Sequence, residues 1–388
     1  MTTRTCGDGS LIGRPAVASG ALSAEIGAVP PTSMRSLTVE PGIANSLRLE
    51  QFRVPPAERG SVLIRAVALG ICGTDREIIA ADYGTPPPNH QRLIIGHESL
   101  GAVEDAPADS GFQRGDLVVG IVRHPDPVPC PNCAVGEWDM CRNGRYTEHG
   151  IKALDGFGSE FYRLEPSFVV PVSAELGLAA VLTEPTSVVA KAWEHCERIG
   201  HRARWNPRSL LVTGAGPVGL LAALLGKQRG LEVHVVDRVQ DGPKPDIVRA
   251  LGATYHADSL DAIPGDFDVV MECTGAPPVI AAVLTRSAPD GVVCLLGVSA
   301  AGRVQSFDLG SLNRQVVLDN RVIFGSVNAN RRHYEAAIAA LRAADKSWLH
   351  RLITRRVPLD AFESAFVREP DDIKTVLLFD PNVVQNLS

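Results

Sequence analysis

The stretch S-L-L-V-T-G-A-G-P-V-G, residues 209–219, decides the fold of this chain. It begins as a short apolar, β-branched run typical of a buried strand and passes through glycines into an apolar segment with helical spacing. A G-x-G-x-x-G turn between a strand and a helix lets the backbone approach a pyrophosphate, and the helix N-terminus offers it unpaired N–H groups. The predicted cofactor contacts in this turn are Gly214, Gly216, Pro217, Val218 and Gly219.

Strand-like and helix-like segments alternate after this turn. Helical patterns follow at 217–229 and 245–251, and further strands are expected at 232–237, 266–272, 291–297 and 322–327. Alternation over this length predicts a doubly wound parallel sheet of the Rossmann type. We therefore assign residues 181–327, including a helix from about Thr186, to a dinucleotide-binding domain.

Asp237 ends the second strand of this domain, 18 residues after Gly219. A carboxylate at this place accepts hydrogen bonds from the adenosine ribose and repels a 2′-phosphate, which favours NAD. Arg238 follows directly and would weaken that repulsion, so NADP use stays open. The alternative is that Asp237 is a solvated turn residue.

Residues before about 175 have a different character. Short apolar runs at 93–95, 116–122 and 168–170 are separated by glycines and turns, which predicts a mostly β domain with long loops. Residues 1–33 are rich in Gly, Ala, Ser and Pro and show no periodicity. We expect a disordered extension there, or a start codon placed too early, with Met34 as the alternative beginning.

A thiol, an imidazole and a carboxylate stand near the ends of two predicted strands of the β domain. Cys72 lies in the turn G-I-C-G-T-D, residues 70–75, and His97 and Glu98 follow Gly96. These groups form the ligand set of a catalytic zinc that keeps one position open. Neighbours in a strand face opposite sides, so Glu98 ligates only if the backbone is irregular. Otherwise Glu98 acts behind the metal ligands or exchanges with water. Glu184, near the junction of the domains, is the expected remaining ligand.

Three further cysteines are clustered in one loop. Cys130, Cys133 and Cys141 have spacings that suit a structural zinc, whose closed site needs four ligands. The fourth ligand could be His124, Asp126 or Asp139. The alternative interpretation is that no metal binds and the thiols only pack.

The composition limits the class of partner. Apolar residues make up 45% of the 388 residues, charged residues 21%, and the net charge is −6 without a basic run. A chain of this kind folds into a substantial core and gives no reason to expect nucleic acid. The sequence contains no run of 18 apolar residues, so it predicts no membrane-spanning helix. Eight cysteines are too sparse for a disulfide scaffold, and we expect a cytoplasmic protein with a small-molecule partner.

Together these residues resemble the zinc-containing medium-chain dehydrogenase/reductase superfamily over residues 34–388. The strings C-G-T-D-R-E at 72–77, Y-T-E-H-G-I at 146–151, D-G-F-G-S-E-F at 155–161 and V-N at 327–328 are similar to those of the archaeal-type glucose 1-dehydrogenases. The resemblance implies a GroES-like catalytic domain over 34–180 and 328–388, with the end of the chain returning to it. It also implies homo-oligomers, either dimers or tetramers.

The resemblance also implies roles for individual residues. The catalytic zinc would be held by Cys72, His97 and Glu98, with Glu184 as the further ligand. Thr74, Glu148 and Asn328 would contact the sugar, with Thr74 also passing a proton towards solvent. Nicotinamide-side contacts are expected from Leu296, Gly297, Val298, Ser326, Val327 and Asn328, and Thr274 is a further predicted cofactor contact.

The leading hypothesis is a zinc-dependent oxidoreductase that transfers hydride from the C1 hydroxyl of an aldose to NAD(P). Glucose, oxidised to gluconolactone, is the expected substrate. Val188 stands four residues after Glu184, where some sugar-oxidising relatives carry an acid, so a polyol (sorbitol-like) or L-threonine dehydrogenase is the alternative. A non-catalytic, nucleotide-binding regulatory protein is the alternative of another class.

Overall fold

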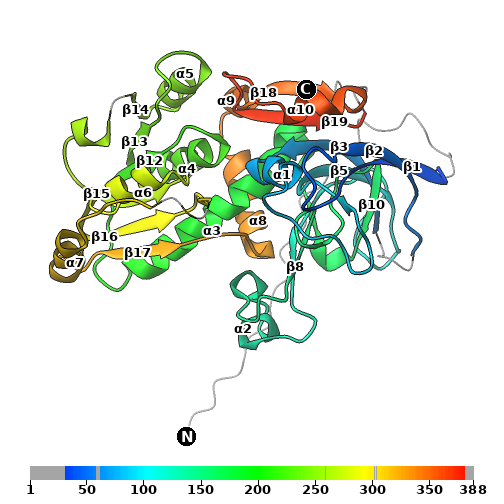
Figure 1. The fold of residues 1–388 in the computed structure, drawn as a ribbon, viewed down its shortest axis with the longest axis horizontal. Helices are drawn as coiled ribbons and strands as arrows, with labels where there is room; N and C mark the ends of the chain where they lie inside the picture. Colours follow the sequence, from blue (N-terminus) through cyan, green and yellow to red (C-terminus); the bar gives the residue numbers. More distant parts are fainter. Residues whose placement is uncertain (1–30, 58–61, 258, 301, 303, 381–388) are drawn as a thin grey trace, which may run out of the picture.

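The computed structural model describes residues 31–57, 62–257, 259–300, 302 and 304–380. Most of the extension predicted over 1–33 therefore lies outside the described residues. Figure 1 shows a mostly β domain beside a domain with a parallel sheet, and the long helix α3 (Thr183–Gly200) runs between them. The two-domain α/β fold predicted from the sequence is confirmed.

The second domain contains a six-stranded parallel sheet in the order β14-β13-β12-β15-β16-β17. Its strands are β12 (Ser209–Thr213), β13 (Glu232–Val236), β14 (Thr254–His256), β15 (Phe267–Glu272), β16 (Ser287–Leu295) and β17 (Val322–Gly325). The helices between them are α4 (Pro217–Gln228), α5 (Pro243–Ala250), α6 (Pro277–Val283) and α7 (Leu309–Leu318). The order reverses on either side of β12, where ligands bind in open α/β sheets. The short edge strand β14 and the helices α6 and α7 were not expected from the sequence.

The first domain is built on a seven-stranded sheet in the order β11-β6-β5-β3-β19-β18, with β10 also paired to β3. The strands are β3 (Val62–Ile71), β5 (Glu98–Asp105), β6 (Leu117–Gly120), β10 (Phe161–Leu164), β11 (Val169–Pro171), β18 (Ile353–Pro358) and β19 (Lys374–Leu378). Because β19 pairs with β3, the end of the chain returns to the first sheet. This return brings Lys374 beside the end of β3 that precedes Cys72.

Smaller elements complete this domain. Two three-stranded sheets contain β1 (Ser33–Val39), β2 (Arg48–Arg53) and β4 (Leu93–Ile94), and β7 (Arg123–His124), β8 (Thr147–His149) and β9 (Ala153–Leu154). Short helices are α1 (Gly73–Ile79), α2 (Pro131–Ala134), α8 (Arg331–Arg342), α9 (Lys346–Leu352) and α10 (Phe362–Phe366). A small lobe that contains α2 extends from the body of the molecule below β8 (Figure 1).

Helix α3 joins the cores of the two domains. It packs against α8, α4 and β16, and its Trp193 is buried in the main hydrophobic cluster. The helix begins at Thr183, three residues earlier than predicted from Pro185. Proline costs little in a first helical turn, where the N–H groups have no partner within the helix. Glu184 is therefore the second residue of the helix, at the inner end of the domain junction.

In the described part of the chain, no helix has both the length and the apolar character needed to cross a membrane.

Candidate active site

Cys72 is held at a sharp transition from strand to helix. Strand β3 ends at Ile71, and α1 begins at Gly73, so Cys72 caps the helix with an extended backbone. The backbone N–H of Cys72 donates to Oδ2 of Asp75 at 2.8 Å. The carboxylate thus satisfies a donor that the helix start leaves unpaired, which fixes the turn that carries the thiol.

His97 and Glu98 both reach the neighbourhood of Cys72. Gly96 has a φ of +94°, a conformation that residues with a side chain rarely adopt, and β5 begins only at Glu98. In a regular strand, adjacent side chains point to opposite faces of the sheet. The irregular backbone here allows His97 and Glu98 to point to the same side. One ligand atom each from Cys72, His97 and Glu98 lie within 4.8 Å of one another.

The charges around His97 suit a cation. Its Nδ1 lies 3.3 Å from Oδ1 of Asp75, and both groups are buried. Burial lowers the pKa of His97, but Asp75 and Cys72 outweigh it and raise the pKa well above its usual value. Because Nδ1 faces Asp75, Nε2 is the nitrogen that remains for a ligand role. The surrounding anions thus favour positive charge at this place, which zinc would supply.

Glu98 is paired with a lysine from the other end of the chain. Lys374 of β19 places Nζ 2.7 Å and 2.6 Å from the two carboxylate oxygens, and also donates to the carbonyl of Ile71 at 3.3 Å. Both side chains are almost fully buried. Gly70 makes room for the pair, because a Cβ there would overlap Oε2 of Glu98. The ion pair favours the interpretation in which Glu98 acts behind the metal ligands.

We predict that Lys374→Met lowers the free energy of unfolding by about 3–5 kcal/mol, because it leaves Glu98 as a buried, uncompensated charge. Urea denaturation measures the loss. In the double variant Lys374→Met/Glu98→Gln most of the stability should return, since both charges are gone. Equal stability of Lys374→Met and the wild type would contradict the buried pair.

Glu184 completes the set of candidate ligands. Desolvation raises its pKa to about 7; His97 opposes this shift, and Glu98 adds to it. His97 and Glu98 act electrostatically on the carboxyl of Glu184, although this carboxyl is not one of the three ligand atoms that lie within 4.8 Å of one another. A buried carboxyl with a raised pKa is stabilised as an anion when a metal ion binds beside it. The residues present therefore fit a zinc ion.

The second cluster lies in the small lobe. Cys130 precedes α2, and its Sγ is 3.7 Å from that of Cys133; Cys141 completes a group whose sulfurs lie within 4.8 Å. The backbone N–H groups of Arg142 and Cys133 lower the pKa of Cys130 to about 6. A stabilised thiolate is the form that binds metal. The three predicted cysteines are thus brought together.

No fourth side chain joins this cluster among the described residues. The three candidates for it have other partners. His124 faces His149 at 3.1 Å between the Nε2 atoms, Asp126 accepts from Val128 and Asn143, and Asp139 pairs with Lys191 at 2.9 Å. The lobe therefore offers three protein ligands instead of a closed set of four.

The predicted sugar contacts Glu148 and Asn328 meet each other. Nδ2 of Asn328 donates to Oε1 of Glu148 at 2.6 Å, although the two residues are 180 positions apart. The guanidinium of Arg123 donates to the same oxygen at 3.0 Å and 2.9 Å. Arg123, which was not singled out in the sequence, thus fixes the carboxylate. Thr74 lies half-buried at the second position of α1.

The glycine-rich turn has the shape that a pyrophosphate requires. Gly214 has a φ of +89°, and a Cβ at Gly219 would overlap the carbonyl oxygen of Gly214, so α4 packs closely on β12. A Cβ at Gly216 would meet no atom within 4 Å, which leaves space above the backbone. Pro217 begins α4 and Val218 follows in its first turn. These residues fit the phosphates of a dinucleotide.

The negative charge of Asp237 is partly compensated by its neighbours. Its carboxylate accepts from the N–H of Ala215 at 2.7 Å and of Val239 at 3.2 Å, and Lys244 places Nζ 3.1 Å away. Burial raises the pKa of Asp237, but the Ala215 N–H and Lys244 outweigh it and lower the pKa. Arg238 follows and is exposed. A lysine thus offsets the charge that would repel a 2′-phosphate.

The remaining predicted cofactor residues lie where the parallel strands end. The buried carboxylate of Glu272 accepts from both the N–H and the hydroxyl of Thr274 and from the N–H of Gly275, while its carbonyl accepts from Leu296 and Gly297. A Cβ at Gly275 would meet the backbone of Val298. Ser326 donates to Leu295, and Val327 follows it. The ends of β15, β16 and β17 therefore gather these residues at one edge.

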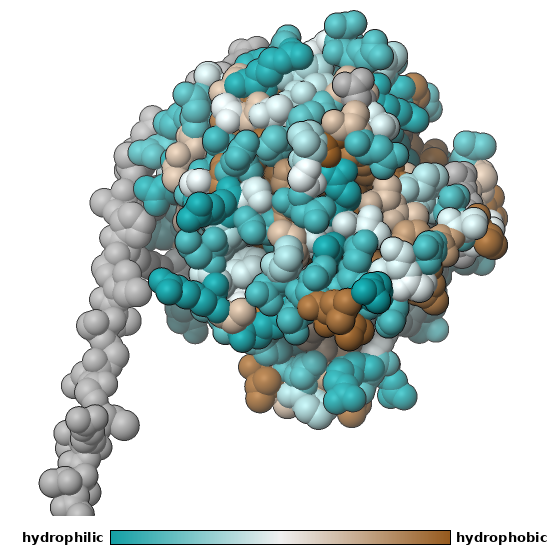
Figure 2. Space-filling view, turned by 90° about the vertical axis from the view of Figure 1, so that its left-hand side faces the viewer, coloured by the Kyte–Doolittle hydropathy of each residue, from teal (hydrophilic) through white to brown (hydrophobic). Residues whose placement is uncertain are grey.

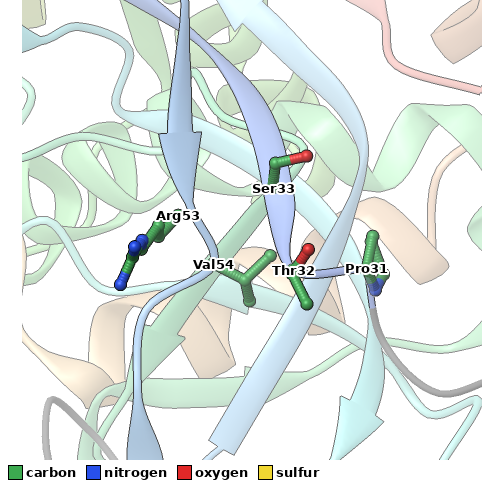
Figure 3. A pocket seen from close by; sticks show the side chains of 5 residues that line it. All are labelled: Pro31, Thr32, Ser33, Arg53 and Val54. Atoms are coloured by element: carbon green, nitrogen blue, oxygen red, sulfur yellow. The ribbon is translucent and has the colours of Figure 1, made fainter.

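A pocket formed at the first hairpin contains none of the predicted site residues. Figure 3 shows its lining, and the five side chains come from the start of β1 and the end of β2. They are Pro31, Thr32, Ser33, Arg53 and Val54. With two hydroxyls, one guanidinium and no acid or imidazole, this pocket lacks the groups of a redox site.

Two family models match this chain. Residues 58–174 match the alcohol dehydrogenase GroES-like domain, and residues 177–379 match the C-terminus of glucose dehydrogenase. Together they cover most of both domains and every residue of the two clusters.

Known relatives match over almost their whole length. Glucose 1-dehydrogenase 1 of Caldivirga maquilingensis is 42% identical over 354 residues, which cover 90% of this chain and 99% of the relative. The glucose 1-dehydrogenase of Thermoproteus tenax is 41% identical over 89% of this chain and 99% of its own. A solved structure of Haloferax mediterranei glucose dehydrogenase in complex with NADP, Zn and gluconolactone has a TM-score of 0.83 and 32% identity, covering 89% of this chain and 99% of its own.

The fold and the site thus define a zinc-containing medium-chain dehydrogenase/reductase. Within that superfamily, the chain belongs to the glucose dehydrogenase family.

Proposed function

We propose that this enzyme oxidises the C1 hydroxyl of an aldose, with glucose as the preferred substrate, to the lactone and transfers the hydride to NAD(P). The observation that carries the proposal is the Cys72, His97 and Glu98 cluster in a chain that also pairs Glu148 with Asn328. A carboxylate and an amide suit a polyhydroxylated substrate better than an apolar alcohol pocket would. The relatives named as glucose 1-dehydrogenases support glucose.

The residues of the chain have distinct tasks in this proposal. A zinc ion held by Cys72, His97 and Glu184 would supply a Lewis acid that lowers the pKa of the sugar hydroxyl. Glu98, paired with Lys374, would stand behind these ligands. Thr74 would carry the hydroxyl proton towards solvent, from its place two residues after Cys72.

Glu148 and Asn328 would orient the sugar ring. Arg123 and Asn328 both donate to Oε1 of Glu148, so Oε2 is the oxygen that would accept from a sugar hydroxyl. The residues at the ends of β15, β16 and β17 would hold the nicotinamide, which accepts the hydride when the coenzyme is bound.

Coenzyme choice depends on Lys244 in this account. We predict that Lys244→Met lowers the ratio of kcat/KM for NADP to that for NAD about tenfold, because Asp237 then repels the 2′-phosphate without compensation. Steady-state kinetics with both coenzymes gives the ratio. Arg249→Met is the control, since Arg249 pairs with Asp246 on an exposed face of α5. An unchanged ratio in Lys244→Met would rule out this role.

The function is tested by initial rates on glucose, galactose, xylose, sorbitol and L-threonine with each coenzyme. Glucose should give the highest kcat/KM, and gluconolactone should form in equal amount to the reduced coenzyme. A preference for sorbitol or threonine would establish the alternative dehydrogenase activity. Coenzyme binding without turnover of any of these compounds would favour a regulatory role.

We further infer a homo-oligomer that associates through the nucleotide-binding domain. Helix α7 has no buried residue, and its Leu309, Val317 and Leu318 are exposed. The neighbouring strand β17 ends the parallel sheet with an open edge. Figure 2 looks onto this side and shows apolar side chains gathered among hydrophilic ones. A second copy of the chain is the occupant that would cover this face.

We predict a native mass in light scattering of two or four times 41.3 kDa. Val317→Asp should shift the mass towards the monomer, whereas Ile43→Asp, at an exposed position in the other domain, should not. A monomeric wild type would contradict the inference.

We also propose a cytoplasmic location, because the seven described cysteines are free thiols.

A further inference from the structure

Lys191 is a buried cation at the junction of the two domains. It lies on α3 with only 2% of its side chain exposed. Its Nζ is 2.9 Å from Oδ2 of Asp139 and 3.2 Å from the carbonyl oxygen of the same residue. The third contact is the carbonyl oxygen of Val327, at 3.0 Å. Three acceptors from two distant segments therefore converge on one ammonium group.

The segment that Lys191 holds carries the predicted substrate contacts. Val327 and Asn328 lie between the end of β17 and the start of α8, where the chain passes from one domain to the other. Asn328 has a φ of +64°, a left-handed conformation that asparagine adopts more readily than other residues with a side chain. The bond from Lys191 to the preceding carbonyl is one restraint on this segment.

A second chain of bonds returns from Asn328 to Asp139. Asn328 donates to Glu148, Glu148 accepts from Arg123, and Arg123 donates to the carbonyl of Asp139 at 3.2 Å. With the contacts of Lys191, these bonds form a closed ring through α3, β7, β8, the small lobe and the segment after β17. A closed hydrogen-bonded ring restrains the geometry of each member more than a single bond does.

We propose that Lys191 is a positioning residue for the dehydrogenase reaction: through the carbonyl of Val327 it sets the place of Asn328, and through Asp139 the place of Arg123 and Glu148. This inference rests on the proposed function, in which Asn328 and Glu148 orient the sugar. Lys191 itself touches neither substrate nor coenzyme. Removing it should displace the sugar and nicotinamide contacts while leaving the zinc ligands in place.

A purely structural role for the buried ion pair is the rival explanation. Other polar groups face the pair: the amide of Asn330 donates to Asp139 at 3.0 Å, and the guanidinium of Arg123 donates to the carbonyl of Asp139. Losing only the lysine would leave Asp139 as an unpaired buried charge and could unfold the protein. A test therefore has to separate the loss of stability from the loss of positioning.

Two variants make this separation. Lys191→Met removes the cation, and Lys191→Met/Asp139→Asn removes both charges while an amide oxygen remains for Asn330. The double variant should regain most of the lost thermal stability. Both should raise KM for glucose about tenfold or more, with a smaller change in kcat, because neither can hold the Val327 carbonyl. Both should also weaken NADPH binding in a fluorescence titration.

Arg332→Met is the matched control. Arg332 joins the same lobe and helices through Glu137 and Glu194, at 2.9 Å and 3.0 Å, and its guanidinium donates to these two carboxylates rather than to the segment after β17. Its KM for glucose and its NADPH affinity should remain within about twofold of the wild type.

A double variant with wild-type KM and wild-type NADPH affinity would overturn the proposal and leave only a structural pair. If the wild type oxidises no aldose, the proposed function fails separately, and NADPH affinity alone decides the inference. An unchanged NADPH affinity in the double variant then overturns the inference. A weakened NADPH affinity in the double variant, with wild-type affinity in Arg332→Met, supports the inference. If Lys191→Met does not fold, the double variant carries the comparison.

Discussion

Replacement of Cys72 by serine is expected to abolish turnover while leaving coenzyme affinity unchanged. A hydroxyl cannot replace the thiolate as a zinc ligand at neutral pH, since its proton is far harder to remove. Loss of the Lewis acid removes several kcal/mol of transition-state stabilisation, which corresponds to roughly a thousandfold or more in rate. Steady-state kinetics, zinc quantification and fluorescence titration with NADH measure the three quantities.

Cys196→Ser provides the control for this change. Cys196 is fully buried on α3, outside both cysteine clusters. Its replacement should lower thermal stability but leave the zinc content and the rate intact. Full activity of Cys72→Ser would contradict the assignment of Cys72, and loss of NADH binding would show that the turn serves the coenzyme as well.

Gly219→Ala is expected to have the opposite effect: zinc remains bound and coenzyme binding fails. The new Cβ would overlap the carbonyl oxygen of Gly214, and neither backbone can move without changing the turn or the distance between α4 and β12. Because the N–H groups of this turn hold the pyrophosphate, NADH affinity should fall at least about a hundredfold. Titration and metal analysis on the same preparation show both effects.

Gly226→Ala separates this effect from a loss of stability. Gly226 lies on the same helix, and a Cβ there would press on the side chain of Leu210 away from the turn. We expect lower thermal stability with NADH affinity close to that of the wild type. Equal affinities for the Gly219→Ala variant and the wild type would refute the predicted pyrophosphate site.

The parts of the fold that depend on residues adjacent in the sequence could be predicted from the sequence alone. The turn at 214–219 shows its own context, with a strand before it and a helix after it. The parallel strands were visible as separate apolar runs. The short edge strand β14 was missed because three residues with only partial burial leave no such pattern.

The partners of the site residues could not be predicted, because they come from distant parts of the chain. Lys374 pairs with Glu98 across 276 positions, and Arg123 meets Glu148 only because β7 pairs with β8. A signal existed in one case: Lys374 is a lone charge at the start of an apolar strand, where a buried cation needs a partner. The sequence does not indicate which acid provides it.

The irregular backbone at Gly96 shows the same limit on a local scale. The sequence left two possibilities for Glu98, as a ligand or as a residue behind the ligands. The φ of +94° at Gly96 brings Glu98 into the cluster, and the pairing with Lys374 then favours the second possibility. A single glycine is compatible with both, so only the three-dimensional arrangement distinguishes them.

The most direct test of zinc-dependent sugar oxidation compares one preparation before and after removal of its metal. Glucose oxidation is followed by formation of reduced coenzyme and of gluconolactone, together with the zinc content per chain. We predict that the stripped protein still binds NADH but forms no product, and that activity returns in proportion to zinc added at the Cys72 cluster. Undiminished oxidation of glucose by protein without metal would contradict this account.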